Sequence, residues 1–213
     1  MKINILCDNK QSWFWDTSDS FINDLKDKGH EVNICKSEDE LSKADISAFI
    51  SCTKIVSKEG LEKSKSNIVC HPSDLPKGRG FSPIAWEILK NSNLITFSLF
   101  EADENIDNGK IYGKKELQLS GTELNDEIKK KQGEVTYSMI LDYVEKYPNN
   151  DSYIQEGEPT YYDRRTPDDS ELDIKKSIKE QFNIFRIVDN NSYPAFFRYK
   201  DEKYILKIEK EKK

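Results

Sequence analysis

The residues best suited to chemistry lie in a loop that follows an apolar run. The run Asn67–His71 reads as a buried strand ending on a histidine, and prolines together with Gly78 and Gly80 punctuate the loop after it. In open α/β sheets ligands bind outside the carboxyl ends of the strands, so His71 projects where a site would form. Glycines allow the backbone to approach a ligand closely. The alternative is a structural histidine that caps the strand before an ordinary turn.

Carboxylates follow the next strand-like run, Asn93–Phe100, and include Glu101, Asp103 and Asp107. We expect their loop to lie at the end of a neighbouring strand, beside the His71 loop. The alternative is an acidic surface turn, since Asp107-Asn108-Gly109 is also a plain turn signal. The two loops together form the candidate site.

A sheet in the first half of the chain must position these loops. Strand-like and helical patterns alternate there, which predicts an α/β fold: a Rossmann-like, mostly parallel twisted sheet with helices on both faces. Neither Gly-x-Gly-x-x-Gly nor a phosphate-loop motif occurs, so a dinucleotide or triphosphate site lacks its main support. The strand-like runs are Ile3–Cys7, Glu31–Cys35, Ile46–Cys52, Asn67–His71 and Asn93–Phe100; helical spacing surrounds Phe21 and Leu25, Glu38–Ser42, Lys58–Ser66 and the stretch that Ser82-Pro83 opens.

The second half of the chain has a different pattern. A helix is expected from an N-cap at Thr122 to Tyr147, followed by a polar, tyrosine-containing stretch over Tyr153–Asp169. An amphipathic helix over roughly Lys175–Val188 and a hairpin across Lys200-Asp201-Glu202 complete the pattern. We therefore expect a catalytic domain over residues 1–150 and a C-terminal extension over 151–213, a small helix and β-hairpin appendage that packs on it.

Composition excludes several classes of function. The net charge is −6, whereas proteins that grip nucleic acid usually carry a basic face, so no nucleic-acid partner is expected. No apolar run approaches the ~20 residues that cross a bilayer, and the start is too quickly polar for a secretory signal. We expect a cytoplasmic protein without a membrane partner. Four scattered cysteines and two histidines lack ligand spacing, which predicts no metal.

The two loops together resemble the formyltransferases that use 10-formyltetrahydrofolate. The family pattern is His-x-Ser-x-Leu-Pro-x-x-Arg-Gly-x-x-Pro, followed further along by Asp-x-Gly. The chain meets it with His71, Ser73, Leu75, Pro76, Arg79, Gly80, Pro83, Asp107 and Gly109. Segments between Glu171 and Phe197 are similar to the part that joins catalytic and accessory regions in tRNA- and sugar-acting members. The resemblance runs over roughly residues 67–208.

The resemblance implies acyl transfer from N10-formyltetrahydrofolate, a co-substrate, to a free amine. His71 would stabilise the oxyanion or shuttle a proton, and Asp107 would orient or charge it and help take the amine proton. Residues implied to contact the folate are Leu75, Pro76, Arg79, Gly80, Phe100, Glu101, Ala102 and Asp103. Residues implied to contact the acceptor are Asn9, Ser12, Trp13, Ser73, Lys77 and Gly78.

One position departs from the family pattern. An asparagine usually stands two residues before the histidine as an oxyanion donor, and here that residue is Val69. Asn67 is no simple replacement, because four strand residues carry it about 13 Å from His71. Either a His71 cation bears the oxyanion alone, another donor such as Ser73 has moved in, or activity has been lost.

The resemblance also limits which class of acceptor is expected. Glycinamide ribonucleotide enzymes carry a glycine-rich phosphate loop, and initiator-tRNA enzymes carry a further basic domain. In place of the glycine-rich phosphate loop, the chain has Cys7-Asp8-Asn9-Lys10. It ends near where the basic domain of the initiator-tRNA enzymes would be expected to begin. Nucleotide-sugar enzymes remain, and the loop Asp8–Trp13 looks like theirs. The function implied is N-formylation of a 4-amino-4,6-dideoxyhexose carried by UDP or dTDP, for lipopolysaccharide or other surface glycan biosynthesis.

Alternatives stay open for several residues and for the activity. Trp13-Phe14-Trp15 is a stacking platform for a uracil or thymine base, or else Phe14 and Trp15 pack under the first helix. Tyr161, Tyr162, Arg164 and Arg165 either line the sugar and diphosphate or form surface ion pairs. The segments Phe182–Phe185 and Tyr193–Tyr199 form a homodimer face or a packed C-terminal core. The competing functions are formyltetrahydrofolate hydrolysis and a non-catalytic module that binds folate or a nucleotide sugar.

Overall fold

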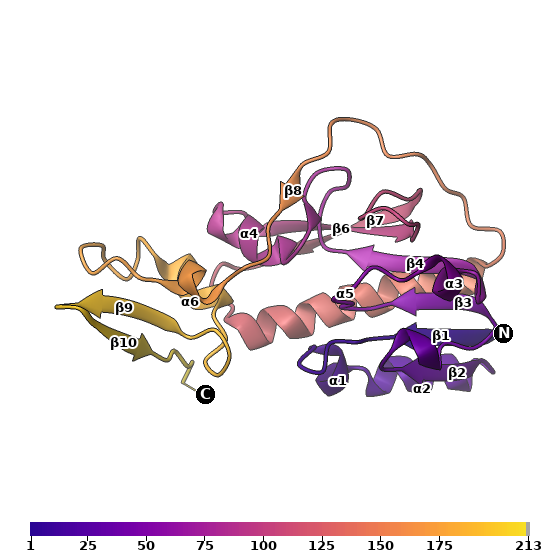
Figure 1. Ribbon diagram of the computed structural model, residues 1–213, viewed down its shortest axis with the longest axis horizontal. Coiled ribbons are helices and arrows are strands. Elements are labelled where there is room, and N and C mark those ends of the chain that lie inside the picture. Colours follow the sequence, from indigo (N-terminus) through magenta and orange to yellow (C-terminus); the bar gives the residue numbers. More distant parts are fainter. Residues whose placement is uncertain (212–213) are drawn as a thin grey trace.

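The computed structural model describes residues 1–211 and is built on a six-stranded sheet in the order β2-β1-β3-β4-β6-β7 (Figure 1). Strands β1 to β4 pair in parallel, β6 runs antiparallel to β4, and β7 runs antiparallel to β6. Only β6 therefore opposes the others, which confirms the mostly parallel sheet. The strands are β1 Lys2–Leu6, β2 Glu31–Cys35, β3 Ala44–Phe49, β4 Ser64–His71, β6 Leu94–Glu101 and β7 Ile111–Gln118.

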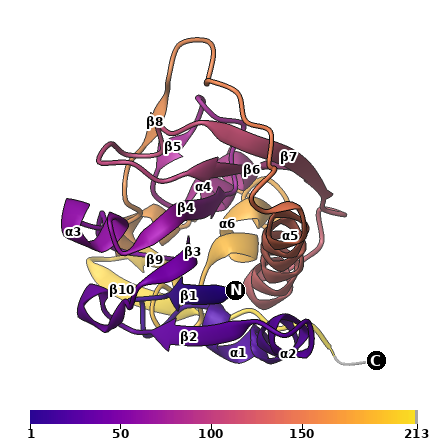
Figure 2. The ribbon, with the colours of Figure 1, turned by 90° about the vertical axis from the view of Figure 1, so that its right-hand side faces the viewer.

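Helices cover both faces of the sheet, as expected (Figure 2). Helices α1 (Phe14–Thr17), α2 (Asp19–Asp27) and α5 (Asn125–Lys146) lie on one face, and α3 (Lys58–Leu61) lies on the other. Side chains of a strand alternate between faces. In β4, Ile68 and Cys70 pack in the core that α5 covers, whereas Val69 packs with Leu75 and Phe100 on the opposite side. His71 shares the face of Val69, away from α5.

Three sequence-based expectations in this region need correction. Helix α5 begins at Asn125 rather than at a Thr122 cap, because the Glu127 carboxylate accepts the backbone N–H of Leu124. Residues Ser64–Ser66, expected to end a helix, belong to β4. Strand β7 was not expected at all. Its central residues, Lys114 to Glu116, are charged and exposed, which suits an edge strand and hides the alternating pattern.

A long segment leads from the end of α5 across the sheet edge to the C-terminal elements (Figure 1). Its residues 151–162, which we name the strap, end in β8 (Tyr161–Tyr162), which pairs with β5 (Arg79–Gly80). A 3₁₀ turn over Pro167–Ser170, helix α6 (Phe182–Ile187) and the hairpin of β9 (Ala195–Tyr199) and β10 (Glu202–Leu206) follow. The expected hairpin is confirmed, with Lys200 and Asp201 at positive φ in its two-residue turn.

The amphipathic helix expected over Lys175–Val188 is wrong in its first half, since α6 begins only at Phe182. The Asp173 carboxylate accepts the backbone N–H of Lys175, and Glu180 accepts that of Ser177. Such local side-chain bonds compete with helix formation. The apolar residues of α6 instead close a small core of the extension with Leu172, Val188 and Ala195.

Within residues 1–211, no helix is long and apolar enough to cross a membrane. The same residues contain no group of three His, Cys, Asp or Glu side chains placed to hold a metal ion. The cytoplasmic location stays a prediction.

Candidate active site

His71 and Asp107 meet at the end of β4. The His71 Nε2 atom lies 2.8 Å from the carbonyl oxygen of Gly78 and 3.8 Å from Oδ2 of Asp107. A carbonyl oxygen only accepts, so Nε2 carries a proton. The backbone N–H of Gly80 donates to the same Asp107 oxygen at 2.8 Å. Because His71 is 7 % exposed, this histidine, carboxylate and amide converge in a largely dry setting.

Asp107 reaches His71 by a route that differs from the expected one. Strand β6 opposes β4, so its end at Glu101 lies beside Ile68 and not beside His71. Helix α4 (Pro83–Leu89) spans only about 10 Å at 1.5 Å per residue, too short to return the chain along β4. The loop after β6 must therefore fold back toward His71.

The fold-back of this loop depends on its backbone geometry. Asp107 adopts a φ of +49°, and the backbone N–H of Glu101 donates to the Lys110 carbonyl. A Cβ on Gly109 would lie 1.6 Å from the carbonyl oxygen of Glu101, so only glycine fits there. The glycine of the Asp-x-Gly pattern is thus a packing requirement that places Asp107.

The His71 loop is held by buried contacts at its middle and by the strap at its end. Leu75 packs against Phe100 and Ile111, and its N–H donates to the Ser98 hydroxyl, which in turn donates to the Ser73 carbonyl. Further along, Gly80 has a φ of +97°, and a Cβ there would lie 2.5 Å from the Tyr162 carbonyl oxygen. Glycine at this position lets β5 pair with β8.

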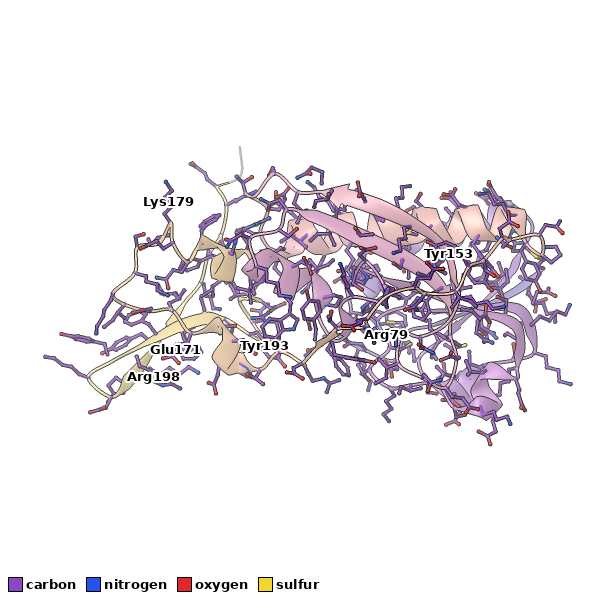
Figure 3. The ribbon with its side chains drawn as sticks, turned by 90° about the horizontal axis from the view of Figure 1, so that it is seen from above. Arg79, Tyr153, Glu171, Lys179, Tyr193 and Arg198 are labelled. Atoms are coloured by element: carbon purple, nitrogen blue, oxygen red, sulfur yellow. The ribbon has the colours of Figure 1, made fainter. Side chains whose placement is uncertain are left out.

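The strap joins both loops (Figure 3). Tyr153 exchanges two backbone hydrogen bonds with Ile111, directly after the Asp107 loop. At its other end, the Thr160 hydroxyl accepts the N–H of Gly78, and the Thr160 carbonyl accepts that of Arg79. Between these anchors, Gln155 contacts Asp107, Gly109 and Arg79. Sequence reasoning missed Gln155, because a single glutamine in a polar stretch carries no periodic or motif signal.

Two buried polar atoms beside His71 find no hydrogen-bond partner within the described chain. They are the Ser73 hydroxyl, 4 % exposed, and Nε of Arg79, 7 % exposed. Unpaired buried polar groups are rare in folded proteins, and they often belong to functional or ligand-binding positions. Both residues stand in the sequence motif, so the site offers polar atoms to a ligand.

The position of the missing asparagine is filled by packing. Val69 lies between Phe49 of β3 and Phe100 of β6 and contacts apolar residues on both sides. Asn67 shares its face, but its Nδ2 donates to the Leu61 carbonyl at 3.0 Å. Neither residue presents a polar donor to His71.

The residues expected to contact folate separate into two groups. Leu75, Arg79, Gly80 and Phe100 lie on the His71 face or in its loop. Pro76 follows Leu75 in the same loop, and Ala102 and Asp103 begin the loop that returns to His71. The Glu101 carboxylate instead accepts hydrogen bonds from the hydroxyls of Ser66 and Tyr112. Burial and this carboxylate raise the pKa of Tyr112.

The residues expected to contact the acceptor are also divided. Ser73, Lys77 and Gly78 belong to the His71 loop, with Lys77 exposed. Trp13, expected to stack on a base, is instead buried, with its ring 5.7 Å from that of Tyr137, because it packs into the core beside α5. Asn9 and Ser12 shape the same turn, where Asn9 accepts the Trp15 indole N–H and Ser12 accepts the N–H of Phe14.

Of the two alternatives for Arg164 and Arg165, surface ion pairs are not found within residues 1–211, and the nearby Asp168 and Glu171 both pair with Arg198. Arg164 lies over the ring of Phe81, 4.8 Å from its centroid. Arg165 donates to the Ser170 hydroxyl and the Ile187 carbonyl.

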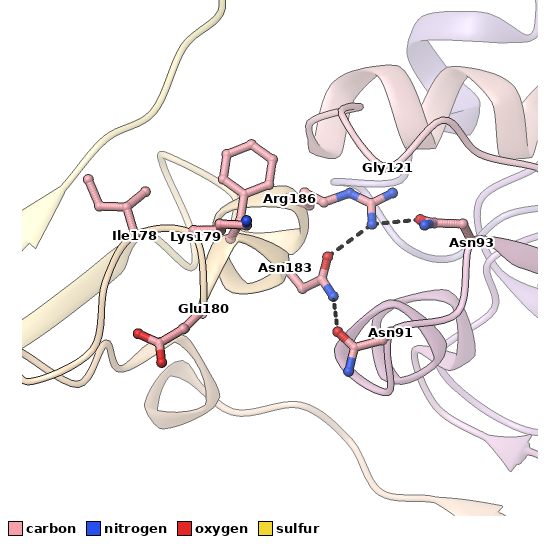
Figure 4. Close-up of a pocket in the computed structure, with 9 residues that line it drawn as sticks. Asn91, Asn93, Gly121, Ile178, Lys179, Glu180, Asn183 and Arg186 are labelled. Atoms are coloured by element: carbon pink, nitrogen blue, oxygen red, sulfur yellow. Dashed lines mark hydrogen bonds between the residues drawn. The ribbon is translucent and has the colours of Figure 1, made fainter.

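A groove of about 660 Å³ lies away from this site, where α6 meets the turns after α4 and β7 (Figure 4). We name it the junction groove. Arg186, 1 % exposed, donates there to the side-chain oxygens of Asn93 and Asn183 and forms an ion pair with Glu123. The groove is lined by Asn91, Asn93, Gly121, Ile178, Lys179, Glu180, Phe182, Asn183 and Arg186.

Comparisons with known proteins show what the chain is similar to. Residues 16–144 match the family described as formyl transferase. A methionyl-tRNA formyltransferase of Thermodesulfovibrio yellowstonii is 29 % identical over 163 residues, which cover 73 % of this chain and 52 % of that protein. A GDP-perosamine N-formyltransferase of Brucella melitensis is 27 % identical, over 62 % of this chain and 50 % of that protein. The chain thus spans about half the length of these curated relatives.

Solved structures share the fold over the whole chain. A methionyl-tRNA formyltransferase from Clostridium thermocellum has a TM-score of 0.83 and 25 % identity, covering 100 % of this chain and 94 % of that one. A 4-N formyltransferase from Francisella tularensis has a TM-score of 0.65 and 20 % identity, covering 99 % and 98 %.

Proposed function

The chain belongs to the formyl transferase family, and we propose that it transfers a formyl group from N10-formyltetrahydrofolate to the amine of a nucleotide-linked amino sugar. The observation that carries the proposal is the convergence of His71, the Asp107 carboxylate and the Gly80 amide at the end of β4. The donor supplies the formyl carbon. The Ser73 hydroxyl and Arg79 Nε, which have no hydrogen-bond partner among residues 1–211, supply polar atoms of the kind that a polar co-substrate satisfies.

The chain's own residues would move the proton and bear the charge. As the acceptor nitrogen bonds to the formyl carbon, negative charge grows on the formyl oxygen, and Nε2–H of His71 would turn from the Gly78 carbonyl toward it. Asp107 would take the proton that leaves the amine, directly or through water. The bond from carbon to the folate nitrogen then breaks, and that nitrogen receives the proton that Asp107 had taken.

Ser73 is our candidate for the donor that replaces the family asparagine at Val69. Its hydroxyl is buried in the His71 loop without a partner among residues 1–211, and its Cβ lies 3.1 Å from where a Cβ on Gly78 would stand. A hydroxyl at this place would share the oxyanion with His71.

Charge and surface chemistry support a nucleotide sugar as acceptor. The chain carries a net charge of −6, which disfavours the grip on phosphates that a tRNA needs. Beside Gly80, the half-exposed Phe81 ring under Arg164 offers a flat face and a cation, which suit a base or a diphosphate. We propose a 4-amino-4,6-dideoxyhexose on UDP or dTDP, made for surface glycan.

Methionyl-tRNA is the second candidate acceptor, because several relatives between 26 % and 31 % identical carry that name. The test offers N10-formyltetrahydrofolate with a panel of UDP-, dTDP- and GDP-linked amino sugars and, separately, methionyl-tRNA. Mass spectrometry detects the gain of one CO unit. A formylated sugar supports the proposal, and a formylated tRNA without any formylated sugar rejects it. Folate binding without product favours the non-catalytic module, and formate release without acceptor favours the hydrolase.

We also propose that two copies associate through the C-terminal hairpin. Tyr199, Tyr204 and Ile205 on the hairpin are each about half exposed or more, and a two-stranded hairpin is marginally stable alone. Sedimentation of the whole protein tests this, since a dimer is expected and a monomer at micromolar concentration rejects it.

A further inference from the structure

Gln155 lies where the strap crosses the candidate active site, and both ends of its side-chain amide form hydrogen bonds. Nε2 donates to the backbone carbonyls of Asp107 and Gly109, each at 2.9 Å. Oε1 accepts a hydrogen bond from Nη2 of Arg79 at 2.7 Å. A primary amide has two N–H donors, and both go to the loop that carries Asp107. The same side chain thus holds the Asp107 loop and the end of the His71 loop.

The base of the Asp107 loop is closed by the Glu101–Lys110 hydrogen bond and by the packing of Gly109, but its tip has few contacts. Glu104, Asn105 and Ile106 are exposed, so no buried packing precedes Asp107. Asp107 itself has a φ of +49°, a conformation that a non-glycine residue keeps only when its surroundings impose it. The surroundings are the Gly80 N–H on its carboxylate and Gln155 on its carbonyl. Removing the amide would leave two carbonyls unpaired and free the backbone to relax.

Arg79 completes the bridge from the other loop. It is 7 % exposed and forms no ion pair within the described chain, so Gln155 is the side-chain partner of its guanidinium. Gly80, whose N–H meets the Asp107 carboxylate, is the next residue. A shift of Gln155 would therefore move two groups that place the Asp107 carboxylate. One is the backbone of Asp107 itself, and the other is the N–H of Gly80, which follows Arg79.

We propose that Gln155 is a positioning residue for formyl transfer, which sets the Asp107 carboxylate against His71 through the carbonyls of Asp107 and Gly109. The strap is then part of the active site, although it follows residue 150. The inference rests on the proposed function only for its activity measurement. Displacement of a catalytic group by about 1 Å can cost on the order of a hundredfold in rate, so a modest shift of Asp107 is enough.

Two substitutions in the full-length protein separate positioning from simple stability. Gln155→Ala removes all three hydrogen bonds. Gln155→Glu keeps the acceptor for Arg79 and the shape, but loses both donors to the Asp107 loop. Glu156→Ala, an exposed neighbour on the strap, is the matched control. We expect both Gln155 variants to lower kcat by roughly ten- to a hundredfold, with KM values for donor and acceptor near those of the wild type.

Hydrogen exchange of the Gly80 amide gives a readout that needs no activity. That amide should exchange faster in both Gln155 variants than in the wild type and in Glu156→Ala, because its acceptor on Asp107 is no longer held. If the wild type formylates no acceptor, the proposed function fails while the exchange result still tests Gln155. Unchanged Gly80 exchange, or a wild-type kcat in Gln155→Glu, overturns the inference. A lower melting temperature with unchanged kcat does so as well, since it reveals a merely structural role.

Discussion

Two regions of this molecule each bury an arginine, and they treat it differently. In the junction groove, Arg186 has a carboxylate partner in Glu123 and two asparagine acceptors. Beside His71, Arg79 has one side-chain partner, Gln155, and its Nε stays unpaired within residues 1–211. The first arrangement fastens the extension to the sheet through an ion pair and two side-chain acceptors, although Nη2 of Arg186 makes no hydrogen bond within residues 1–211. The second has no carboxylate partner among the described residues, which leaves the charge of Arg79 for a ligand.

The junction groove is a hollow of about 660 Å³, so volume alone would make it a candidate site. Its buried charge, Arg186, however, pairs with Glu123. The His71 end holds a histidine, a carboxylate and the backbone amide of Gly80 close together, which is the arrangement that proton transfer needs. The convergence of groups that can move a proton, rather than volume, therefore marks the site in this fold.

The largest expected effect is on turnover at the His71 end. His71→Asn and Asp107→Asn should each lower kcat by about 10²–10⁴-fold, because each removes a group that moves the proton or bears its charge. Glu104→Gln, an exposed change in the same loop, is the control. Steady-state kinetics and thermal unfolding check the pair. Near-normal turnover in either variant would remove the basis for the assignment.

Removing each of the two arginines in turn tests this comparison. Arg186→Ala should lower the free energy of unfolding by about 1–3 kcal/mol, because it leaves the partly buried side-chain oxygens of Asn93 and Asn183 without their donor while Lys131 still pairs with Glu123. The protein that remains folded should keep its kcat. Arg79→Ala should do the reverse, with a loss of kcat that exceeds its loss of stability. Urea unfolding measures the loss of stability, and steady-state kinetics at low temperature measure kcat. If the two variants lost stability and kcat to the same extents, the proposed difference between the two arginines would be wrong.

The ion pairs at the junction should also make the free energy of unfolding depend on pH. Burial acts to raise the pKa of Glu123, but the bonds from the Lys131 ammonium and the Ser120 amide outweigh it and leave the pKa well below its ordinary value. Because the pKa of Glu123 is lower in the folded than in the unfolded chain, its carboxylate stabilises the fold at pH values above the unfolded pKa of ~4.3. This stabilisation is lost as the pH falls toward the folded pKa.

Glu123→Gln should therefore be less stable than the wild type at neutral pH, with the difference narrowing below about pH 4. Urea midpoints at several pH values check this. A difference that stays constant with pH would show that the charge of Glu123 does not hold the junction.

The smallest expected effect concerns the position of the missing asparagine. Val69→Asn places a polar amide among Phe49, Leu75 and Phe100, and should cost about 1–3 kcal/mol of stability without preventing folding. We expect kcat to stay within a few-fold of the wild type, because Ser73 and His71 already share the oxyanion in our proposal. A large rise in kcat would show instead that Val69 marks a weakened site.

Local patterns predicted much of this fold. The runs that became β1 to β4 and β6 are short and apolar, and the Lys200-Asp201 turn suits a two-residue hairpin. The loop motifs also brought His71 and Asp107 together, because the glycines at 78, 80 and 109 carry backbone demands that a sequence reveals.

Features set by distant contacts were not predictable. The reversed direction of β6 follows from the shortness of α4, which alternation of strand and helix does not encode. Trp13 has the same local pattern whether it faces a base or Tyr137. Gln155 acts only because the strap crosses two loops that precede it by more than 40 residues. These are consequences of tertiary packing rather than of propensity.

The location of bound folate tests the central claim most directly. We would determine a crystal structure of the full-length protein with tetrahydrofolate and compare the His71 face with the junction groove. The account predicts the ligand against the His71 loop, on the sheet face away from α5 and within reach of Ser73 and Arg79. Density in the groove beside Asn93 and Arg186, with the His71 face unoccupied, would contradict it.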